Sequence, residues 1–204
     1  MARTYSYAEQ WPVIARRIQA FNPQNMEKFR KFAEQAIRDK QSYIEVEISS
    51  RVPWPLIAVI HRRESDADFS TYLGNGQPLG QRTTIEPIGR GPFETFLQGA
   101  LDGLNVDGLT AVQQLGDLWT TGRLWGSWPI EKMLFYAEKL NGLGYFFKGN
   151  PSPYIWGLTN IQVPGKYTSD GVYDPSVMDT QPGCAPILWM IGHLDPSVQF
   201  TRET

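Results

Sequence analysis

The apolar residues of the chain recur mostly at helical spacing. Stripes at three- and four-residue intervals predict helices over residues 11–21 and 26–37, and charged residues separate the apolar positions of the second stripe. Ser6 and Glu9 stand at capping-box spacing before the first stripe. The segment QSYIEVEISS alternates β-branched and polar residues, but its polar positions also fit one helix face. We therefore predict a third helix there.

The segment VPWPLIAVIHRRES predicts a buried central helix. Pro53 and Pro55 fit the first turn of a helix, where the missing N–H costs nothing. Residues 56–60 form a continuous apolar run, and charged residues follow it. A helix that is apolar on all sides belongs in a core.

The second half of the chain alternates helices with turn-rich segments. Glycines and prolines over residues 66–92 predict a loop-rich flap, with a small hairpin around Arg82–Ile85. Helical periodicity returns over residues 93–104 and 129–140, with Ser127 as a plausible N-cap for the latter helix. Turns dominate from Asn141 onward, and a final helix is expected near residues 187–191.

Length and composition bound the domain organisation and the partners. With 204 residues, 41% of them hydrophobic, we expect one continuous globular domain and a monomer, with N-terminal helices in residues 1–50 packed on a unit formed by residues 51–204. The net charge of -2 argues against a nucleic-acid partner. Charged residues interrupt the N-terminal segment, so it has the pattern of neither a signal peptide nor a membrane-inserted span.

Few residues suggest cofactor or metal chemistry. A phosphate-binding loop, a dinucleotide fingerprint and a zinc motif are all absent from the sequence, and we expect an enzyme without cofactor or metal. Cys184 is the single cysteine and fits a small buried thiol. His61 precedes Glu64 by three residues, so we expect it to pack beneath or support that residue.

Glu64 is the strongest candidate for chemistry. It stands where an apolar helix meets a polar loop, an environment that raises a carboxyl pKa and keeps a proton available for donation. Cleavage of a glycosidic bond requires such a donor. By position alone, an ion pair of Glu64 with Arg62 or Arg63 is equally compatible with the sequence.

Four segments together carry a resemblance to a known family. IAVIHRRES resembles the helix that delivers the acid glutamate, followed by serine, in goose-type lysozymes and lytic transglycosylases. LNGLGY, NPSPYIWGLTN and GKYTSDGVYDP, taken with it, resemble lysozyme-like peptidoglycan hydrolases of phages and bacteria. The resemblance runs from about Val52 to Cys184.

The resemblance implies a fold and an activity. The fold would be mainly α, lysozyme-like, with a small β-hairpin or flap and a glycan-binding groove. The activity would be that of a muramidase, which cleaves the β-1,4 bond between N-acetylmuramic acid and N-acetylglucosamine in peptidoglycan strands, with Glu64 as general acid. Such a phage endolysin would stay in the host bacterial cytoplasm until a holin releases it to the cell wall for host cell lysis, or would be part of the virion.

The glycan would contact residues from both halves of the chain. The resemblance assigns this role to the NGLGY turn and the Tyr/Trp loop after it, and glycines there permit close approach of a sugar. For each aromatic ring alone, core packing is an equally good interpretation. Ser65 fits a local cap as well, and Lys166 could meet a carboxylate of the peptidoglycan. The candidate substrate-binding residues are Ser65, Tyr72, Asn141, Gly142, Gly144, Tyr145, Tyr154, Trp156 and Lys166.

The sequence leaves the second catalytic group open. A second carboxylate would either activate water or form a covalent intermediate, and the candidates are Asp66, Asp68, Glu86 and Asp170. Related enzymes with one acid use groups of the sugar itself, which gives a 1,6-anhydro product in lytic transglycosylases. Two further alternatives are a chitinase or chitosanase and, in another class, a non-catalytic glycan-binding virion protein.

Overall fold

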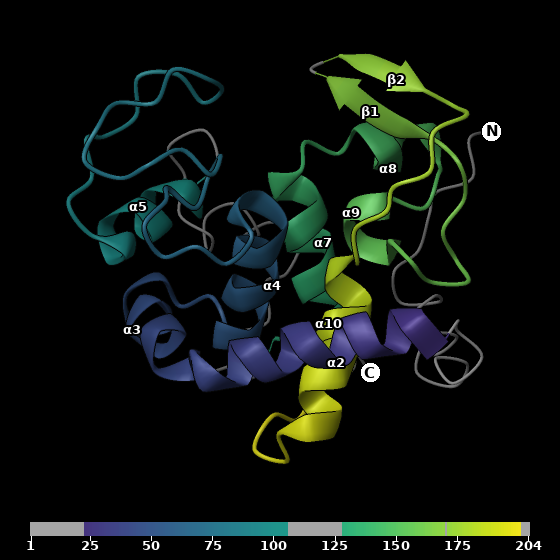
Figure 1. Cartoon of the computed structure of the whole chain (residues 1–204), viewed down its shortest axis with the longest axis horizontal. Coiled ribbons are helices and arrows are strands. Elements are labelled where there is room, and N and C mark those ends of the chain that lie inside the picture. The colour runs from purple at the N-terminus through teal and green to yellow at the C-terminus, as the bar shows by residue number, and fades with distance from the viewer. Residues whose placement is uncertain (1–22, 106–127, 170, 201–204) are drawn as a thin grey trace. The chain divides into compact units, whose positions relative to one another are not determined.

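The computed structural model of the chain describes residues 23–105, 128–169 and 171–200. These residues are mainly helical, with one two-stranded antiparallel sheet (Figure 1), which confirms the predicted class of mainly α with a minor β element. Whether the arrangement is that of a lysozyme stays a prediction. The predicted helix over residues 11–21, its capping residues and the expected cap Ser127 lie outside the described residues.

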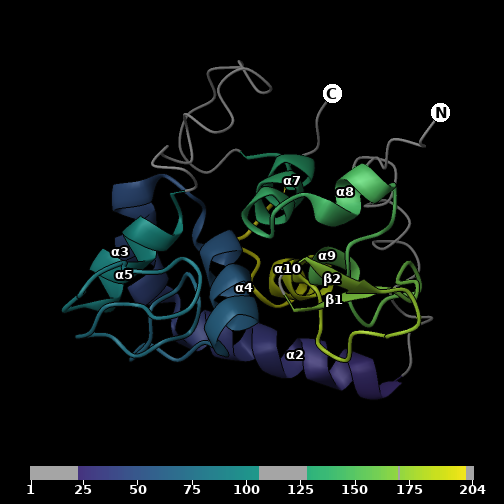
Figure 2. The same cartoon turned by 90° about the horizontal axis from the view of Figure 1, so that it is seen from above.

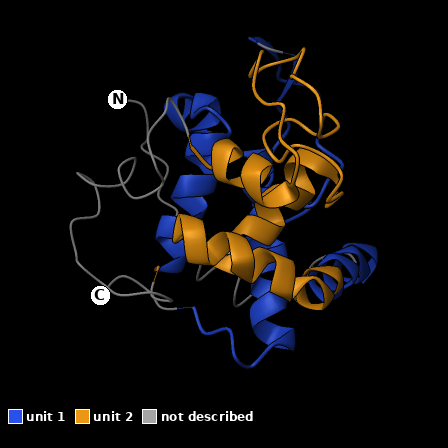
Figure 3. Cartoon of the chain, turned by 90° about the vertical axis from the view of Figure 1, so that its left-hand side faces the viewer, with its two compact units in different colours: residues 1–34, 129–204 blue, residues 35–128 orange. Residues whose placement is uncertain are grey.

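The chain divides into two compact units (Figure 3). Unit 1 comprises residues 1–34 and 129–204, and unit 2 comprises residues 35–128. The first boundary falls within helix α2 (Pro23–Arg38). The predicted division at residue 50 matches neither boundary, and the expectation of one continuous domain stays a prediction.

Helix α2 confirms the amphipathic prediction for residues 26–37. Phe29, Ala33 and Ala36 are buried at three- and four-residue spacing, while the charged residues between them are largely exposed. In unit 1, the Asn25 side-chain amide donates to the carbonyl of Leu158 over 3.3 Å and ties the start of the helix to a distant loop.

Three further helices lie in the described residues of unit 2: α3 (Lys40–Ser50), α4 (Trp54–Ser65) and α5 (Phe96–Gly103). Figure 2 shows α3 beside the other two. The β-branched segment is helical, as predicted. Tyr43 and Val46 lie one turn apart on α3 and are both buried, and α3 packs against α4 and α5. Burial of this face outweighs the weak strand preference of the β-branched residues.

Helix α4 is the buried central helix that the sequence predicts. Pro53 is its N-cap and Pro55 lies in the first turn. Every residue from Trp54 to His61 is buried. Exposure begins only with the charged residues of the last turn, so the helix brings Glu64 from the core of unit 2 to its margin.

The flap over residues 66–92 is rich in turns, as predicted, but the hairpin expected around Arg82–Ile85 is wrong. Those four residues form no strand. The Gln77 side-chain oxygen accepts the N–H groups of Thr84 and Ile85, at 2.8 and 3.1 Å. The Gln77 side chain thus binds the backbone N–H groups that a β-ladder would need. Within the described flap residues 66–92, β-type backbone pairing occurs as an isolated antiparallel bridge between Thr71 and Pro78.

Helix α5 begins three residues later than its periodicity suggests. Thr95 and Gln98 form a reciprocal capping box, in which each side chain accepts the backbone N–H of the other. This pair sets the start of the helix at Phe96, because the backbone of Thr95 is extended. Thr95 and Gln98 stand at capping-box spacing in the sequence, but a prediction from apolar periodicity alone does not use this signal.

The part of unit 1 that the structure describes contains four further helices: α7 (Ile130–Leu140), α8 (Gly144–Lys148), α9 (Pro153–Trp156) and α10 (Cys184–Leu194). The N-cap of α7 is Pro129, so the expectation of Ser127 at that position is wrong. Helix α9 packs against α7 and α10, and α10 extends the predicted final helix at both ends.

The sheet of the structure lies in a segment for which the sequence predicts only turns. Strands β1 (Lys166–Ser169) and β2 (Val172–Asp174) pair antiparallel, with Tyr167 opposite Tyr173. The turn signal SDG stands between two short runs that each carry a tyrosine. Cross-strand aromatic pairs stabilise such hairpins. The prediction of turns alone did not take the pairing of these two tyrosines into account.

Candidate functional site

The end of α4 is fixed by the carbonyl oxygen of His61. It accepts the N–H of Asp66, the N–H of Ala67 at 3.2 Å and the Ser65 hydroxyl at 3.2 Å. Asp66 adopts a left-handed conformation with φ of 58°, which ends the helix. Glu64 lies half-buried in the last turn, two residues before this stop. The hydroxyl of Ser65 therefore serves as a local cap, the more conservative of its two predicted roles.

The side chain of His61 connects three parts of unit 2. Its Nδ1 lies 3.0 Å from the hydroxyl of Tyr43 on α3, and its Nε2 lies 3.2 Å from the carbonyl oxygen of Asp68. The ring also packs against Phe69 and Phe96, with centroid distances of 4.9 and 4.5 Å. Burial lowers the pKa of His61 to about 4, against the smaller opposing effect of Asp68. His61 is thus a neutral packing residue beneath the helix end, as predicted.

Basic groups surround the end of α4. Arg62 forms an ion pair with Asp66, one turn further on. Burial lowers the pKa of Arg62, and the adjacent Arg63 lowers it further. The carboxyl group at position 64 therefore directly follows two guanidinium-bearing residues in the sequence.

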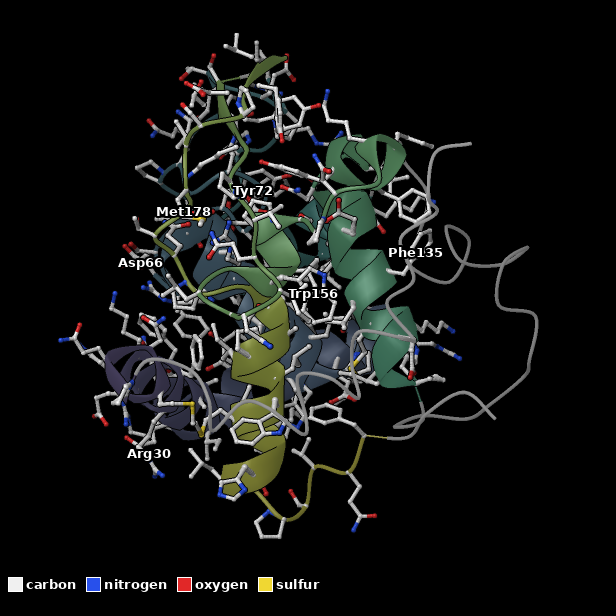
Figure 4. All side chains as sticks on the ribbon, turned by 90° about the vertical axis from the view of Figure 1, so that its right-hand side faces the viewer. Arg30, Asp66, Tyr72, Phe135, Trp156 and Met178 are labelled. Atoms are coloured by element: carbon white, nitrogen blue, oxygen red, sulfur yellow. The ribbon has the colours of Figure 1, made fainter. Side chains whose placement is uncertain are left out.

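Two of the candidate second carboxylates already have local partners. Asp66, which is labelled in Figure 4, is exposed and forms an ion pair with Arg62. Asp68 accepts the N–H and the hydroxyl of Ser70 at 2.9 and 2.7 Å, and these bonds lower its pKa. Glu86 lies exposed in the flap, and Asp170 falls outside the described residues.

Tyr72 anchors the flap to α5. Its side chain is only 2% exposed, and its hydroxyl donates to Asp102 over 2.7 Å. Arg90 completes the cluster through an ion pair with the same carboxylate. The Tyr72 ring stacks on Phe93 at 5.1 Å, inclined by 21°. The ring and the hydroxyl of this candidate substrate-binding residue thus both contact other residues of unit 2.

In unit 1, the NGLGY turn joins α7 to α8. Asn141 is the C-cap of α7, and Leu143 and Gly142 have left-handed backbones. Gly142 is exposed, with open space where a side chain would begin. At Gly144 a Cβ would lie 3.0 Å from the ring of Tyr167, so this glycine permits an aromatic contact within the protein.

The three aromatic candidates of unit 1 are buried. Trp156 is fully buried where α9 packs against α7 and α10, and Figure 4 labels it there. Tyr154 is buried on the same short helix. The hydroxyl of Tyr145 accepts the N–H of Tyr167 over 2.9 Å, and burial raises the pKa of Tyr145. These rings shape the unit from within, which fits their interpretation as packing residues.

Lys166 pairs with a carboxylate that sequence reasoning missed. Its ammonium lies 3.2 Å from Oδ1 of Asp179, whose side chain is 1% exposed. Asp179 also accepts the N–H of Gln181 over 3.0 Å. A neighbouring cluster was missed as well: Lys148 lies 4.7 Å above the ring of Tyr173. Only the hairpin register, with its paired tyrosines, could have indicated this cluster from sequence.

The candidate residues fall into both units. Glu64, Ser65, Asp66, Asp68, Tyr72 and Glu86 belong to unit 2, whereas Asn141, Gly142, Gly144, Tyr145, Tyr154, Trp156 and Lys166 belong to unit 1. The unit 2 residues other than Glu86 come within one continuous stretch that leaves α4 and enters the flap. The predicted groove, which takes residues from both units, stays a prediction.

The described residues contain neither a cluster of metal ligands nor a membrane-spanning helix. Within residues 23–105, 128–169 and 171–200, no group of three or more His, Cys, Asp or Glu side chains is arranged to hold a metal ion. In the same part of the chain no helix has the length and apolar character needed to cross a bilayer.

Comparisons with known proteins give no relative for this chain. No protein-family model, curated protein or solved structure matches it. The functional conclusion therefore depends on the residues and geometry described above.

Proposed function

We propose that the chain is a lysozyme-like peptidoglycan hydrolase in which Glu64 is the general acid. The observation that carries the proposal is the position of Glu64. It is half-buried in the last turn of a helix whose preceding residues, 54–61, are all buried. Desolvation at such a place favours the neutral, proton-donating form of a carboxyl group.

The chemistry needs one proton donor at the bond that breaks. The Glu64 carboxyl gives its proton to the glycosidic oxygen, the bond from that oxygen to C1 of N-acetylmuramic acid breaks, and the bonding electrons stay with the departing sugar. Water then attacks C1 and gives a proton back to the Glu64 carboxylate, which leaves a reducing end and restores the acid.

The proposed substrate is the peptidoglycan strand of a bacterial cell wall, and the proposed biological role is lysis of a bacterial host by a phage enzyme. Both follow from the resemblance of the four segments named above. The buried environment of Tyr154 and Trp156 is compatible with it, because rings beneath a surface can shape a groove without stacking on sugar.

One observation favours a lytic transglycosylase as a second candidate. Asp66 is paired with Arg62, and Asp68 is bonded to Ser70, so both of these candidate second carboxylates already have local partners. An enzyme with one acid can let the C6 hydroxyl of the sugar attack C1, with loss of its proton, which yields a 1,6-anhydro end. The same acid, Glu64, serves both reactions.

The test combines turbidity and product analysis. Purified chain is added to a suspension of purified peptidoglycan, and Glu64→Gln is the paired variant, because it keeps the size of the side chain and removes the proton donor. We expect clearing by the native chain and a loss of at least about 100-fold in Glu64→Gln. Equal clearing by both proteins would remove Glu64 from this role.

Mass spectrometry of the released fragments separates the two reactions. Reducing ends indicate a hydrolase and 1,6-anhydro ends a transglycosylase. Binding of peptidoglycan without any clearing would instead indicate a non-catalytic glycan-binding protein. Release of fragments from chitin but not from peptidoglycan would point to the chitinase alternative.

A further inference from the structure

The backbone of the flap rests directly on the end of α4 at the residue proposed as the acid. Gly76 has φ of +71°, and a Cβ at this position would lie 3.0 Å from the carbonyl oxygen of Glu64. It would also lie 3.5 Å from both Cα and Cβ of Ser65. A Cβ at 3.0 Å from a backbone oxygen is closer than nearly all real contacts of this kind, so one of the two segments would have to shift by a few tenths of an ångström.

The turn that carries Gly76 is closed by its own hydrogen bonds. The N–H of Tyr72 donates to the carbonyl of Gln77 over 2.7 Å, and the N–H of Gly76 donates to the carbonyl of Tyr72 over 2.9 Å. The N–H of Gln77 donates to the side chain of Asn75 over 3.1 Å. The turn over residues 72–77 is therefore closed by internal hydrogen bonds and is not an extended loop.

The same turn is fixed on two sides away from α4. On one side, the Tyr72 hydroxyl donates to Asp102 of α5. On the other side, the Asn75 amide donates to the carbonyls of Ile85 and Glu86, both at 3.2 Å. A segment held at both ends resists displacement, so its contact with the backbone of Glu64 limits the movement of the helix end.

We infer that the turn Tyr72–Gln77 is a positioning element for Glu64, and that Gly76 is the positioning residue that makes the contact. Its catalytic consequence rests on the proposed function, whereas the contact itself does not. Displacement of the Glu64 backbone carries the carboxyl group with it. Misplacement of a catalytic group by about 1 Å costs up to about 100-fold in rate, and a shift of a few tenths of an ångström costs correspondingly less.

Gly76→Ala and Gly80→Ala form a matched pair. Gly80 lies in the same flap with φ of +80°, and nothing lies within 4 Å of where its Cβ would be. Both substitutions impose an alanine on a left-handed backbone, but only the one at position 76 meets Glu64 and Ser65. We expect kcat to fall about 2- to 10-fold in Gly76→Ala, with KM changed less than about twofold, and kcat in Gly80→Ala to stay near the native value.

A second variant separates contact from backbone strain. Asparagine tolerates the left-handed conformation better than alanine, yet its Cβ meets the same carbonyl. We expect Gly76→Asn to lose kcat as Gly76→Ala does, at temperatures where circular dichroism shows both variants folded. Native kcat in a folded Gly76→Asn would overturn the inference.

A measurement independent of activity tests the position of Glu64 directly. In protein labelled with ¹³C at the glutamate carboxyls, the Glu64 signal is assigned by its loss in Glu64→Gln and followed against pH. We expect its titration to be displaced in Gly76→Ala and unchanged in Gly80→Ala, and equal titration in both would overturn the inference. If the native chain clears no peptidoglycan, the proposed function fails, while this comparison still decides the positional inference.

Discussion

The hydroxyl of Tyr43 lies 3.0 Å from Nδ1 of His61, and both side chains are buried where α3 packs against α4. The opposite ring nitrogen, Nε2, lies 3.2 Å from the carbonyl oxygen of Asp68. A neutral ring that donates from Nε2 and accepts at Nδ1 satisfies both contacts. In a protonated ring Nδ1 also carries a hydrogen, so the Tyr43 hydroxyl could no longer donate to it and would have to rotate to accept instead. The pair therefore favours uncharged histidine.

This arrangement makes the stability of unit 2 depend on pH. Burial lowers the pKa of His61 to about 4, while an unfolded histidine titrates near 6.5. Between these values the unfolded chain binds a proton that the folded chain does not, so the free energy of unfolding falls as the pH drops. The loss is absent above about pH 6.5 and complete below about pH 4, and amounts to on the order of 3 kcal/mol. Urea unfolding at several pH values measures it.

Two variants check that His61 is responsible. His61→Gln removes the titrating group, so its free energy of unfolding should be lower at neutral pH but should change less between pH 6.5 and 4. His193→Gln changes the chain's other histidine, which is exposed, and should keep the native pH dependence. If His61→Gln retained the full native slope, other groups would account for it.

The parts of the fold that the sequence predicts are those with strong local patterns. The apolar run of residues 56–60 leads directly to a buried helix, and the stripe of Phe29, Ala33 and Ala36 leads to an amphipathic one. The flap shows the opposite case. The strand expected at Arg82–Ile85 is replaced by bonds to the side chain of Gln77, and no local pattern reveals such a partner several residues away.

The candidate site divides in the same way. Glu64 is identifiable because a helix boundary and its polarity change are local features of the sequence. The contact of Gly76 with Glu64 is not, because Gly76 and Gly80 are both flap glycines with positive φ and differ only in what lies beside them. Asp102 and Asp179 were missed for the same reason, since their partners are distant in sequence.

Tyr72→Phe should destabilise unit 2 without disturbing its packing. The variant keeps the ring stacked on Phe93 and removes only the hydroxyl that donates to Asp102. Hydrogen bonds to charged groups contribute about 1.5–3 kcal/mol, and because Asp102 is partly exposed and retains Arg90, we expect a loss near the lower end of that range. Urea unfolding gives the value, and a double-mutant cycle with Asp102→Asn isolates the pair. Additive losses in the cycle would contradict a direct bond.

Lys166→Met should reduce stability more than it affects glycan binding. The substitution leaves the carboxylate of Asp179, which is almost fully buried, without its ammonium partner. Breaking such a pair is costly because a buried charge remains, and since the Gln181 N–H still donates to it, we expect about 2 kcal/mol. The matched control is Lys148→Met, which removes an exposed lysine above Tyr173 and should cost less than about 1 kcal/mol. Equal losses in the two variants would contradict the special role of Asp179.

Tyr145→Phe tests whether the NGLGY tyrosine acts on the glycan or on the protein. Its hydroxyl accepts the N–H of Tyr167 at the start of the hairpin, and the side chain is buried. Removal of this acceptor leaves a backbone donor of β1 without the bond, so we expect a loss of about 1 kcal/mol in the free energy of unfolding.

The kinetic readout of the same variant separates the two roles. A tyrosine whose hydroxyl is engaged by the hairpin should leave KM for peptidoglycan changed by less than about twofold. The control is Tyr173→Phe, in the facing strand, whose hydroxyl accepts from the side chain of Asn150 over 3.2 Å. The opposite outcome is a tenfold rise in KM for Tyr145→Phe at native stability, with Tyr173→Phe unaffected. This result would assign the Tyr145 hydroxyl to the substrate, because loss of a bond made only to the glycan cannot alter the folding of the free protein.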